Sequence, residues 1–276
     1  MIFVKPEEIV AFETLSIWPA YFYKKINKNV NIHVHHHEYA SLEELVASSS
    51  YIKFLHRKEK ELFKQATFSH TNEDRKVLYL KDHANIIAAK VEVYPNLPPL
   101  SWWNDFGSKK KAWKGPKIKM VYVGALDLDT MYVKEVVEWM HDYPELFELT
   151  FISHQMNAET RSYIESKAGC QIELMEPINY ANLPTELIKY DLGLILYKGH
   201  LLNHIYSVPN KVNEYLYCGL KVIGDNCLIS TSKLNQPDIL LFSFKDGLKS
   251  ENIIEFTHRH FQFDCLNNNS LIQRYI

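Results

Sequence analysis

The second half of the sequence alternates short apolar segments with segments of helical periodicity, and this alternation constrains the fold more than any other feature. Strands are expected at 118–124, 147–153, 171–175, 191–197, 220–224 and 239–244. Helices are expected at 130–141, 157–167, 180–190 and 209–218; in the first of these, Val133, Val136 and Val137 stand at helical spacing. This order predicts βαβ units and a parallel sheet. Because the strands are apolar throughout, helices should cover both faces of the sheet.

The first half of the chain shows the same alternation with fewer elements. Strands are expected at 8–11, 31–35, 66–70 and 91–94, and helices at 17–25, 42–50, 51–65 and 72–80. These strands are too few for an independent doubly wound domain, so we expect an incomplete α/β domain over residues 1–97. Prolines and glycines punctuate residues 98–116, which predicts a linker, and residues 117–276 form a second, larger α/β domain.

Composition excludes several classes of function. The 276 residues carry a net charge of −2, so no global positive field would recruit nucleic acid. A local basic run at 109–119 is either a solvated linker or a patch for an anionic ligand or a membrane surface. The aromatic residues of this region, Trp102, Trp103, Phe106 and Trp113, either stack on a sugar or enter a membrane interface, or they pack the linker onto the two domains. The four cysteines lack CxxC spacing and indicate buried thiols. No stretch reaches the roughly 18 apolar residues of a spanning helix. We therefore expect a soluble cytoplasmic protein, at most peripheral to the inner face of a membrane.

The expected sheet also nominates the position of a ligand. In open parallel sheets, ligands bind beyond the carboxyl ends of the strands. That rule selects the loops at 124–130, 154, 176–179, 198–208 and 225–230. No Gly-x-Gly-x-x-Gly pattern follows the first of these strands, which disfavours an oxidoreductase of the dinucleotide-binding type.

The most informative segment is 207–224, which reads as a loop, a helix with proline in its first turn, a glycine stop and a buried strand. The N-terminus of such a helix, at Asn210, offers unpaired N–H groups and partial positive charge, both of which suit a phosphate. Lys211 adds a cation in the first turn. The carboxylate of Glu214 could accept hydrogen bonds from two ribose hydroxyls, as acidic residues do in dinucleotide folds. A surface ion pair between Lys211 and Glu214 is the alternative interpretation.

This segment resembles the carboxyl-terminal signature of the large retaining glycosyltransferase family with the GT-B fold, Pro-x-Lys-x-x-Glu-Tyr-Leu-x-x-Gly-x-x-Val-Ile. The matching residues are Pro209, Lys211, Glu214, Tyr215, Leu216, Gly219, Val222 and Ile223. The stretch 176–191 is similar to the region that precedes the family's Asp-x-Gly strand. The resemblance covers residues 117–246. It implies a GT-B-like α/β fold in which residues 117–276 form a Rossmann-type domain that binds a nucleotide-sugar donor.

The resemblance also implies roles for individual residues. Glu214 would hold the ribose, while Lys211 and the helix N-terminus at Asn210 would hold the pyrophosphate. Backbone groups near Pro177 and Ile178 would face the nucleotide base. Because lysine and helix supply positive charge, no metal or other cofactor is expected.

Two positions depart from the family pattern. Ser207 stands where a second glutamate often contacts the donor sugar. Gly124, which ends the first strand, is followed by Ala125 rather than by arginine, and a lysine that usually grips phosphate is missing there. Lys198 is a candidate to replace this missing cation.

The first half resembles part of a GT-B acceptor domain. Residues 5–14 are similar to its middle, and residues 31–39 are similar to a His-Glu strand end beside the cleft. The resemblance then implies that the first strands of that domain are absent, as in a truncated or split enzyme. His37 would orient the transferring sugar or the acceptor hydroxyl. Ordinary strand-end histidines, or a zinc site at 33–37, are the alternatives.

The predicted function is transfer of a sugar from a nucleotide diphosphate donor to a saccharide or lipid-linked acceptor, in polysaccharide biosynthesis. Two alternatives stay open. One is a catalytically degenerate nucleotide-sugar-binding or scaffold protein, which Ser207 and Ala125 favour. The other is a sugar-nucleotide epimerase on the same fold.

Overall fold

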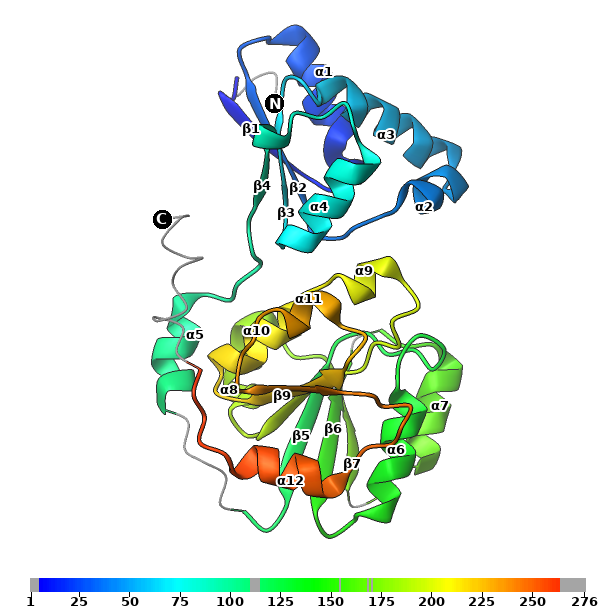
Figure 1. Ribbon diagram of the computed structural model, residues 1–276, viewed down its shortest axis with the longest axis vertical. Coiled ribbons are helices and arrows are strands. Elements are labelled where there is room, and N and C mark those ends of the chain that lie inside the picture. The colour runs from blue at the N-terminus through cyan, green and yellow to red at the C-terminus, as the bar shows by residue number, and fades with distance from the viewer. Residues whose placement is uncertain (1–4, 110–114, 154, 168, 170, 264–276) are drawn as a thin grey trace. The chain divides into compact units, whose positions relative to one another are not determined.

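The computed structural model describes residues 5–109, 115–153, 155–167, 169 and 171–263. The chain divides into two compact units. Unit 1 consists of Met1–Asn96 with Leu201–Ser207, and unit 2 of Leu97–His200 with Val208–Ile276. Each unit contains its own sheet, and every strand pair in both sheets is parallel (Figure 1).

Unit 2 is built on a six-stranded sheet with the order β10-β9-β8-β5-β6-β7. The strands are β5 (Ile118–Val123), β6 (Phe147–Ile152), β7 (Ile172–Met175), β8 (Leu192–Ile195), β9 (Lys221–Asp225) and β10 (Ile239–Phe242). All six expected strands are present, and the predicted parallel sheet is confirmed. The direction in which strands are added reverses between β5 and β8. This topological switch point is where open α/β sheets form their ligand crevice.

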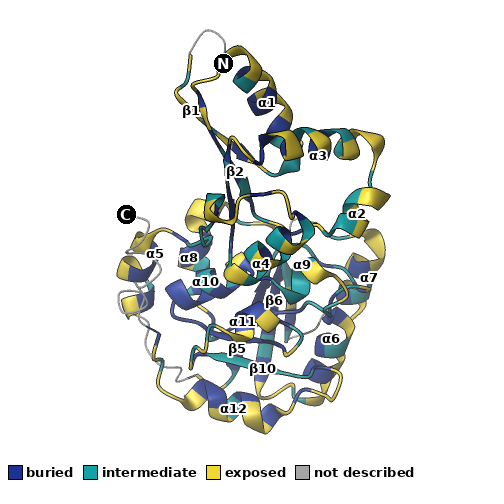
Figure 2. Cartoon of the chain, turned by 45° about the horizontal axis from the view of Figure 1, so that its top comes forward, coloured by how far each residue is buried: buried dark blue, intermediate teal, exposed yellow. Residues whose placement is uncertain are grey.

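Helices cover both faces of this sheet because its strands are apolar on both sides. They are α5 (Leu100–Asp105), α6 (Val133–Asp142), α7 (Ala158–Lys167), α8 (Leu183–Leu187), α10 (Asn210–Tyr217), α11 (Ile229–Ser232) and α12 (Ser250–His258), with short 3-10 turns η3 (Gly107–Lys109) and η4 (Tyr180–Asn182). On β5, Met120 and Tyr122 join one buried cluster with α6, α7 and α12, whereas Val121 joins another with α5, α8 and α10. Buried residues accordingly lie along the strands, and exposed ones on the outer sides of the helices (Figure 2).

Part of the segment that was expected to be a linker belongs to unit 2. Trp102 and Trp103 on α5 are buried, and Trp103 packs edge-on against Phe263 with ring centroids 5.6 Å apart. This packing agrees with the interpretation in which the aromatic residues pack the linker onto a domain. Trp113 and the lysines at 110, 111 and 114 lie outside the described residues.

Unit 1 contains a four-stranded sheet in sequential order, β1-β2-β3-β4. Its strands are β1 (Glu8–Phe12), β2 (Asn31–His36), β3 (Thr67–His70) and β4 (Val91–Val93), and its helices α1 (Ile17–Ile26), α2 (Leu42–Ala47), α3 (Ser50–Leu62), α4 (Glu73–Asp82) and α9 (Leu202–Ile205), with turns η1 (Thr14–Ser16) and η2 (Ala88–Lys90). Alternate strand residues such as Ile32, Val34 and Phe68 pack with α1 and α3 in one core. The other side of β2 carries His33 and His35, which contact Ser69 on β3.

A short segment from the second half of the chain completes unit 1. The guanidinium of Arg75 on α4 donates to the Asn203 carbonyl oxygen at 2.9 Å and to its side-chain oxygen at 2.5 Å. The same side-chain oxygen accepts from the backbone N–H of Tyr39 at 3.0 Å. These bonds explain why Leu201–Ser207 groups with unit 1 although it follows β8 in sequence.

Candidate functional site

Tyr215 fixes helix α10 against the end of β5, next to the switch point. Strands β5 and β8 pair only at Met120–Leu192 and Val121–Gly193. Beyond this pairing, the buried Tyr215 hydroxyl accepts a hydrogen bond from the Val123 N–H at 3.0 Å. The Tyr215 ring lies so close to β8 that a Cβ at Gly193 would stand 2.1 Å from it. The aromatic ring therefore sets the position of α10 relative to both strands.

Lys211 lies directly over Gly124, the residue that follows β5. Gly124 has φ +125°, a backbone conformation that L-residues rarely adopt. A Cβ at this position would stand 2.8 Å from Cε and 3.0 Å from Nζ of Lys211. The structure thus brings together the strand-end glycine and the first-turn lysine, which the sequence nominated separately.

The Lys211 ammonium is held by aromatic rings instead of by a carboxylate. Its Nζ lies 5.4 Å from the ring centre of Tyr122 and 5.7 Å from that of Tyr197. Burial alone would lower the pKa of Lys211, but the two tyrosines and Glu214 outweigh this effect and raise it, so the side chain is charged. Within the described part of the chain, no salt bridge involves Lys211. A half-buried cation without a paired anion attracts an anionic ligand.

Glu214 lies one turn further along α10 and is buried, with 9% of its surface exposed. Burial raises the pKa of its carboxyl group, an effect that Lys211 and the Tyr180 hydroxyl oppose. The described residues show no ion pair between Lys211 and Glu214, and Glu214 does not lie on an open surface. The alternative of a helix-surface ion pair therefore does not describe this geometry.

The loop after β7 lies beside Glu214. Ile178 packs on the buried cluster around α10, while Pro177 is exposed. Two residues further on, Tyr180 is the hydrogen-bond partner of Glu214, and burial together with that carboxylate raises the pKa of Tyr180 to about 12. The Tyr180 ring also lies 5.0 Å from that of Trp102. The loop predicted to face a nucleotide base therefore reaches the same side of α10 as Glu214.

The remaining predicted donor residues are placed differently. Asn210 is exposed at the start of α10, where no side chain caps the helix N-terminus. Lys198 is already paired: its ammonium donates to the Leu128 carbonyl oxygen at 3.0 Å and lies 3.1 Å from a Glu135 carboxylate oxygen. Ser207 belongs to unit 1, and its buried hydroxyl donates to the His204 carbonyl oxygen at 2.8 Å. Lys198 and Ser207 are thus both engaged by protein groups.

His37 follows β2 in unit 1 and is fixed through its backbone. Its N–H donates to Glu13 Oε1 at 2.6 Å, and its carbonyl oxygen accepts from Arg75. The imidazole ring is half-buried and packs edge-on against Phe12 and His35, with centroids 5.6 and 4.6 Å away. No group of three or more His, Cys, Asp or Glu among the described residues is arranged to hold a metal ion.

Sequence reasoning missed the tyrosines that organise this site. Tyr122, Tyr197 and Tyr215 surround or position Lys211, and Tyr180 contacts Glu214. Tyr122 belongs to β5, Tyr197 lies two residues after the end of β8, and Tyr215 is part of the signature itself. Their place at strand ends was the available signal, but a hydrophobic pattern does not distinguish a packing tyrosine from one that lines a site.

Comparison with known proteins identifies the fold. No protein-family model and no curated protein sequence matches the chain. Solved structures do match it. The N-terminal domain of Candida albicans trehalose-6-phosphate phosphatase superposes with a TM-score of 0.62 at 14% identity, over 97% of this chain and 65% of that one. Anabaena HepE in complex with UDP and glucose superposes with a TM-score of 0.65 at 11% identity, over 97% of this chain and 77% of HepE. A Listeria monocytogenes protein assigned as a UDP-N-acetylglucosamine 2-epimerase superposes with a TM-score of 0.57 at 13% identity, over 93% of this chain and 69% of the Listeria chain.

These similarities confirm the predicted α/β, GT-B-like fold. At 11–14% identity they show the fold alone. The chain spans less than two thirds of the Candida domain, at 65% of its length.

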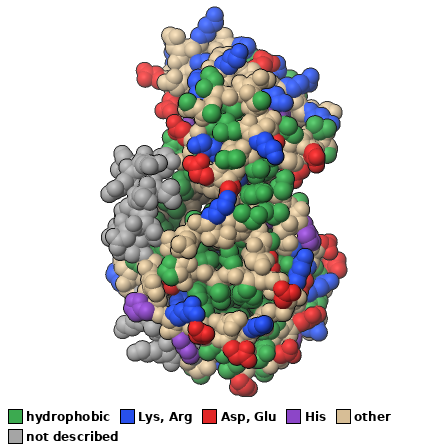
Figure 3. Space-filling view, viewed as in Figure 1, with side chains coloured by type: hydrophobic (Ala, Val, Ile, Leu, Met, Phe, Trp, Pro, Cys, Tyr) green, Lys and Arg blue, Asp and Glu red, His purple; other side chains and the backbone are tan. Residues whose placement is uncertain are grey.

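Acidic and basic side chains are interspersed over the described part of the face shown in Figure 3, without a continuous basic surface. Among the described helices, none has the length and apolar character needed to traverse a bilayer.

Proposed function

We propose that this protein is a glycosyltransferase that binds the diphosphate of a nucleotide-sugar donor at the N-terminus of α10. One observation carries the proposal. The Lys211 ammonium has no paired carboxylate among the described residues, lies against Gly124 at the switch point, and stands in the first turn of an uncapped helix. A lysine and free helix N–H groups at the carboxyl edge of a parallel sheet form an anion site. A nucleotide diphosphate supplies the matching charge.

The proposed chemistry is electrostatic. As the bond between sugar and diphosphate breaks, negative charge accumulates on the leaving phosphate oxygen, and Lys211 with the N–H groups of α10 stabilises it. Glu214 accepts hydrogen bonds from the ribose hydroxyls. Pro177 and Ile178 flank the base through their backbone groups. Because the protein supplies this positive charge itself, the proposal requires no metal ion, and EDTA should leave donor affinity unchanged.

The acceptor half of the proposal rests on unit 1. We place a saccharide or lipid-linked acceptor there, with His37 orienting the reacting hydroxyl by a hydrogen bond. A role in polysaccharide biosynthesis at the cytoplasmic face of a membrane fits such an acceptor. HepE, which was solved with UDP and glucose and has the same fold, supports a uridine nucleotide as the first donor to test.

A thermal-shift and calorimetric screen against UDP, GDP, ADP and their common sugars tests this function. The proposal expects one diphosphate to stabilise the protein selectively, with one-to-one stoichiometry. Incubation of the matching nucleotide sugar with mixed saccharide acceptors should then release free diphosphate and a glycosylated product detectable by mass spectrometry. A chain that binds none of these diphosphates contradicts the proposal.

An epimerase is a second candidate, because the Listeria protein assigned as a UDP-N-acetylglucosamine 2-epimerase shares the fold. It predicts conversion of UDP-N-acetylglucosamine without any acceptor, which NMR of the sugar protons would detect.

A donor-binding protein without activity is a third candidate. It is favoured by Ser207, whose hydroxyl is already engaged by a protein carbonyl oxygen. It predicts donor binding with neither transfer nor epimerisation.

A further inference from the structure

Unit 1 contains a polar cavity that the proposed donor site does not use. The cavity has a volume of about 230 Å³, and we call it the histidine cavity after His36, His56, His70 and His83, which line it together with Glu59 and Tyr79. Its walls come from the ends of β2 and β3, from α3 and α4, and from the turn after β1. The cavity is therefore built from one side of the unit 1 sheet, whereas His33 and His35 lie on the other side.

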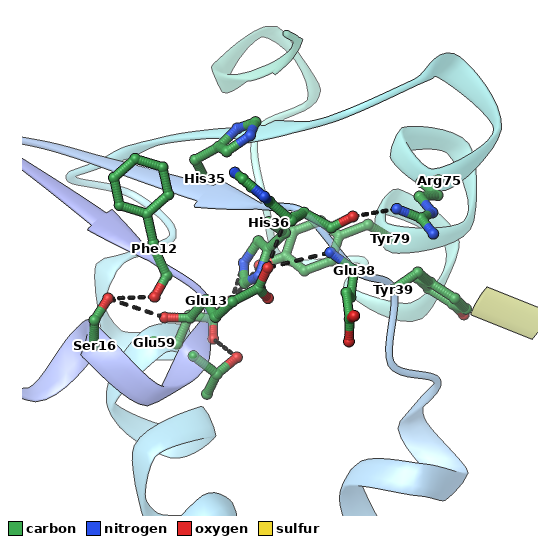
Figure 4. Close-up of polar contacts among 12 residues, drawn as sticks. Phe12, Glu13, Ser16, His35, His36, Glu38, Tyr39, Glu59, Arg75 and Tyr79 are labelled. Carbon is green, nitrogen blue, oxygen red and sulfur yellow. Dashed lines mark hydrogen bonds and ion pairs between the residues drawn. The ribbon is translucent and has the colours of Figure 1, made fainter. Parts of the chain in front are cut away.

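The centre of the histidine cavity carries fixed charges. His36 Nε2 lies 3.0 Å from Glu59 Oε1, and His36 Nδ1 lies 3.5 Å from Glu13 Oε2. Tyr79 and Thr14 donate to the same Glu59 carboxylate at 2.7 and 2.8 Å. Burial alone would lower the pKa of His36, but the two carboxylates raise it to about 9, so the ring is an imidazolium at neutral pH. Figure 4 shows Glu13, Glu59 and Tyr79 gathered around His36.

The other histidines of the cavity are neutral. Burial lowers the pKa of His83 to about 4 and holds the pKa of His70 well below its usual range, with His36 adding to the second effect. One imidazolium between two carboxylates leaves the lining with a net negative charge. Phosphorylated and carboxylated ligands are therefore disfavoured, because burying a further anion beside Glu13 and Glu59 costs free energy. The His36 imidazolium does not offset this cost, since it is already paired with both carboxylates.

His70 brings buried hydrogen-bonding groups without a protein partner to the lining of the histidine cavity. Only 1% of its surface is exposed, and neither ring nitrogen has a hydrogen-bond partner within the described residues. His56 Nε2, in the same lining, also lacks one. A neutral imidazole has one donor and one acceptor nitrogen. An unmet buried polar group costs about 1–3 kcal/mol. The two ring nitrogens point in different directions, so a ligand with two or more hydroxyl groups, one accepting from His70 and another donating to it, would satisfy the ring.

The remaining lining completes the description of the ligand. Leu15, Leu45 and Ile52 give the cavity an apolar wall, which suits the C–H face of a ring. The volume of about 230 Å³ corresponds to about eight waters at roughly 30 Å³ each, which is room for one monosaccharide. The Tyr79 ring is tilted toward His70, with centroids 4.5 Å apart, and forms a flat aromatic boundary.

We propose that the histidine cavity binds an uncharged, hydroxyl-rich molecule of monosaccharide size, with the two ring nitrogens of His70 as its central hydrogen-bonding groups. This site lies wholly within unit 1 and does not depend on the donor site proposed for unit 2. It can therefore be tested without any nucleotide. The same chemistry could come from a free sugar or polyol, or from the terminal residue of a longer saccharide.

Saturation-transfer NMR and calorimetry on the full chain, without nucleotide, provide the test. The probes are glucose, N-acetylglucosamine, myo-inositol, methyl α-glucoside and glucose 6-phosphate. We expect at least one neutral probe to bind with one-to-one stoichiometry, and glucose 6-phosphate to bind at least tenfold more weakly than glucose. Binding of the methyl glycoside equal to that of glucose would identify the end of a longer saccharide as the source, whereas its loss would identify a free sugar.

Three variants locate the binding. His70→Phe removes both nitrogens and should weaken binding at least tenfold. Ile52→Phe fills the cavity from its apolar wall and should abolish binding without touching a polar group, which keeps the test decisive if His70→Phe fails to fold. His33→Ala, on the opposite side of the same sheet, is the matched control and should bind as the wild type does.

The proposal is overturned if no neutral probe binds and the cavity holds water only, if both cavity variants bind normally, or if the phosphorylated sugar binds more tightly than glucose. A separate UDP titration of the same samples reports on unit 2. Loss of UDP binding with retained sugar binding would refute the proposed function alone. The reverse result would refute the sugar site alone.

Discussion

Lys211 occupies the space that a side chain at position 124 would need, since a Cβ there would stand 2.8 Å from Cε and 3.0 Å from Nζ of the lysine. Glycine is therefore required both by its φ of +125° and by the lysine above it. We expect Gly124→Ala to strain the backbone by about 1–3 kcal/mol and to displace the ammonium. The melting temperature should fall, and UDP affinity should fall with it.

The control for this change is Gly169→Ala, because a Cβ at Gly169 would meet nothing within 4 Å. Thermal denaturation and calorimetry of the two variants side by side separate a local effect at Lys211 from a general effect of removing glycine. Equal UDP affinity in Gly124→Ala and Gly169→Ala would show that the position of the lysine does not matter for binding.

Glu214 should favour binding at the cost of stability. Burial raises the pKa of Glu214 in the folded protein and so disfavours the ionised carboxylate. The contribution of Glu214 to the free energy of unfolding therefore decreases as the pH rises from 4.5 through the folded-state pKa. Glu214→Gln resembles the protonated form. We expect the free variant to melt at a higher temperature at neutral pH, yet to bind the nucleotide more weakly by about 1–3 kcal/mol. Differential scanning calorimetry with and without UDP measures both effects, and unchanged affinity would remove Glu214 from the ribose site.

Tyr215 should be needed for stability near the switch point. Tyr215→Phe keeps the ring that packs on Gly193 but leaves the Val123 N–H without its acceptor. The expected loss is about 1–3 kcal/mol, measured by denaturant unfolding. Hydrogen exchange should accelerate at Val123 and Gly124 before it does in the centre of β5. Exchange that is unchanged at these two amides would show that the hydroxyl does not hold α10 to the strand.

The buried pair of His36 and Glu59 should give unit 1 a stability maximum in mildly acidic solution. The pKa of His36 is raised from 6.5 to about 9 in the folded protein. The stabilisation that His36 contributes to folding is therefore fully present below pH 6.5 and is lost as the pH rises through 9. Burial would raise the pKa of Glu59, but His36, Tyr79 and Thr14 lower it from 4.5 to about 2. Its contribution is therefore present above pH 4.5 and is lost toward pH 2.

Hydrogen exchange of peptides from β2 and α3 measures this profile without interference from unit 2. Protection should be greatest between pH 4.5 and 6.5, after correction for the intrinsic exchange rate, and should decline toward pH 9. Glu59→Gln should destabilise unit 1 by about 3–5 kcal/mol, because it removes the closer and more deeply buried of the two carboxylates that face the His36 imidazolium. A flat profile in the wild type would contradict the assigned charges.

Secondary structure was largely predictable because local pattern determines it. The apolar run at 118–124 corresponds to β5 (Ile118–Val123), and the helix expected at 130–141 corresponds to α6 (Val133–Asp142), which begins three residues later. The parallel sheet followed from the alternation itself. The helix expected at 180–190 instead begins as a 3-10 turn and ends at Leu187, since Pro184 restricts where a regular helix can start.

The site was predictable only in part, because side chains meet there through tertiary packing. The signature placed Lys211 and Glu214 on α10, and strand order placed Gly124 at the sheet edge. Nothing in the local sequence showed that Lys198 would be paired with Glu135, or that Tyr180 would reach Glu214. The histidine pattern drew attention to His33, His35 and His37, whereas the buried ion pairs involve His36, which lies on the opposite side of the strand.

The central claim is that Lys211, rather than another lysine of unit 2, holds the diphosphate. Calorimetric titration of UDP, in low-salt buffer, into the wild type, Lys211→Met and Lys198→Met tests it most directly, because both substitutions remove one charge and keep an unbranched chain. We predict that Lys211→Met weakens UDP binding by about 10–100-fold, equivalent to roughly 1.5–3 kcal/mol for hydrogen bonds to a charged group. Lys198→Met should change affinity by less than about threefold, since Lys198 already bonds to Glu135 and Leu128. Equal affinities in Lys211→Met and the wild type would contradict the account.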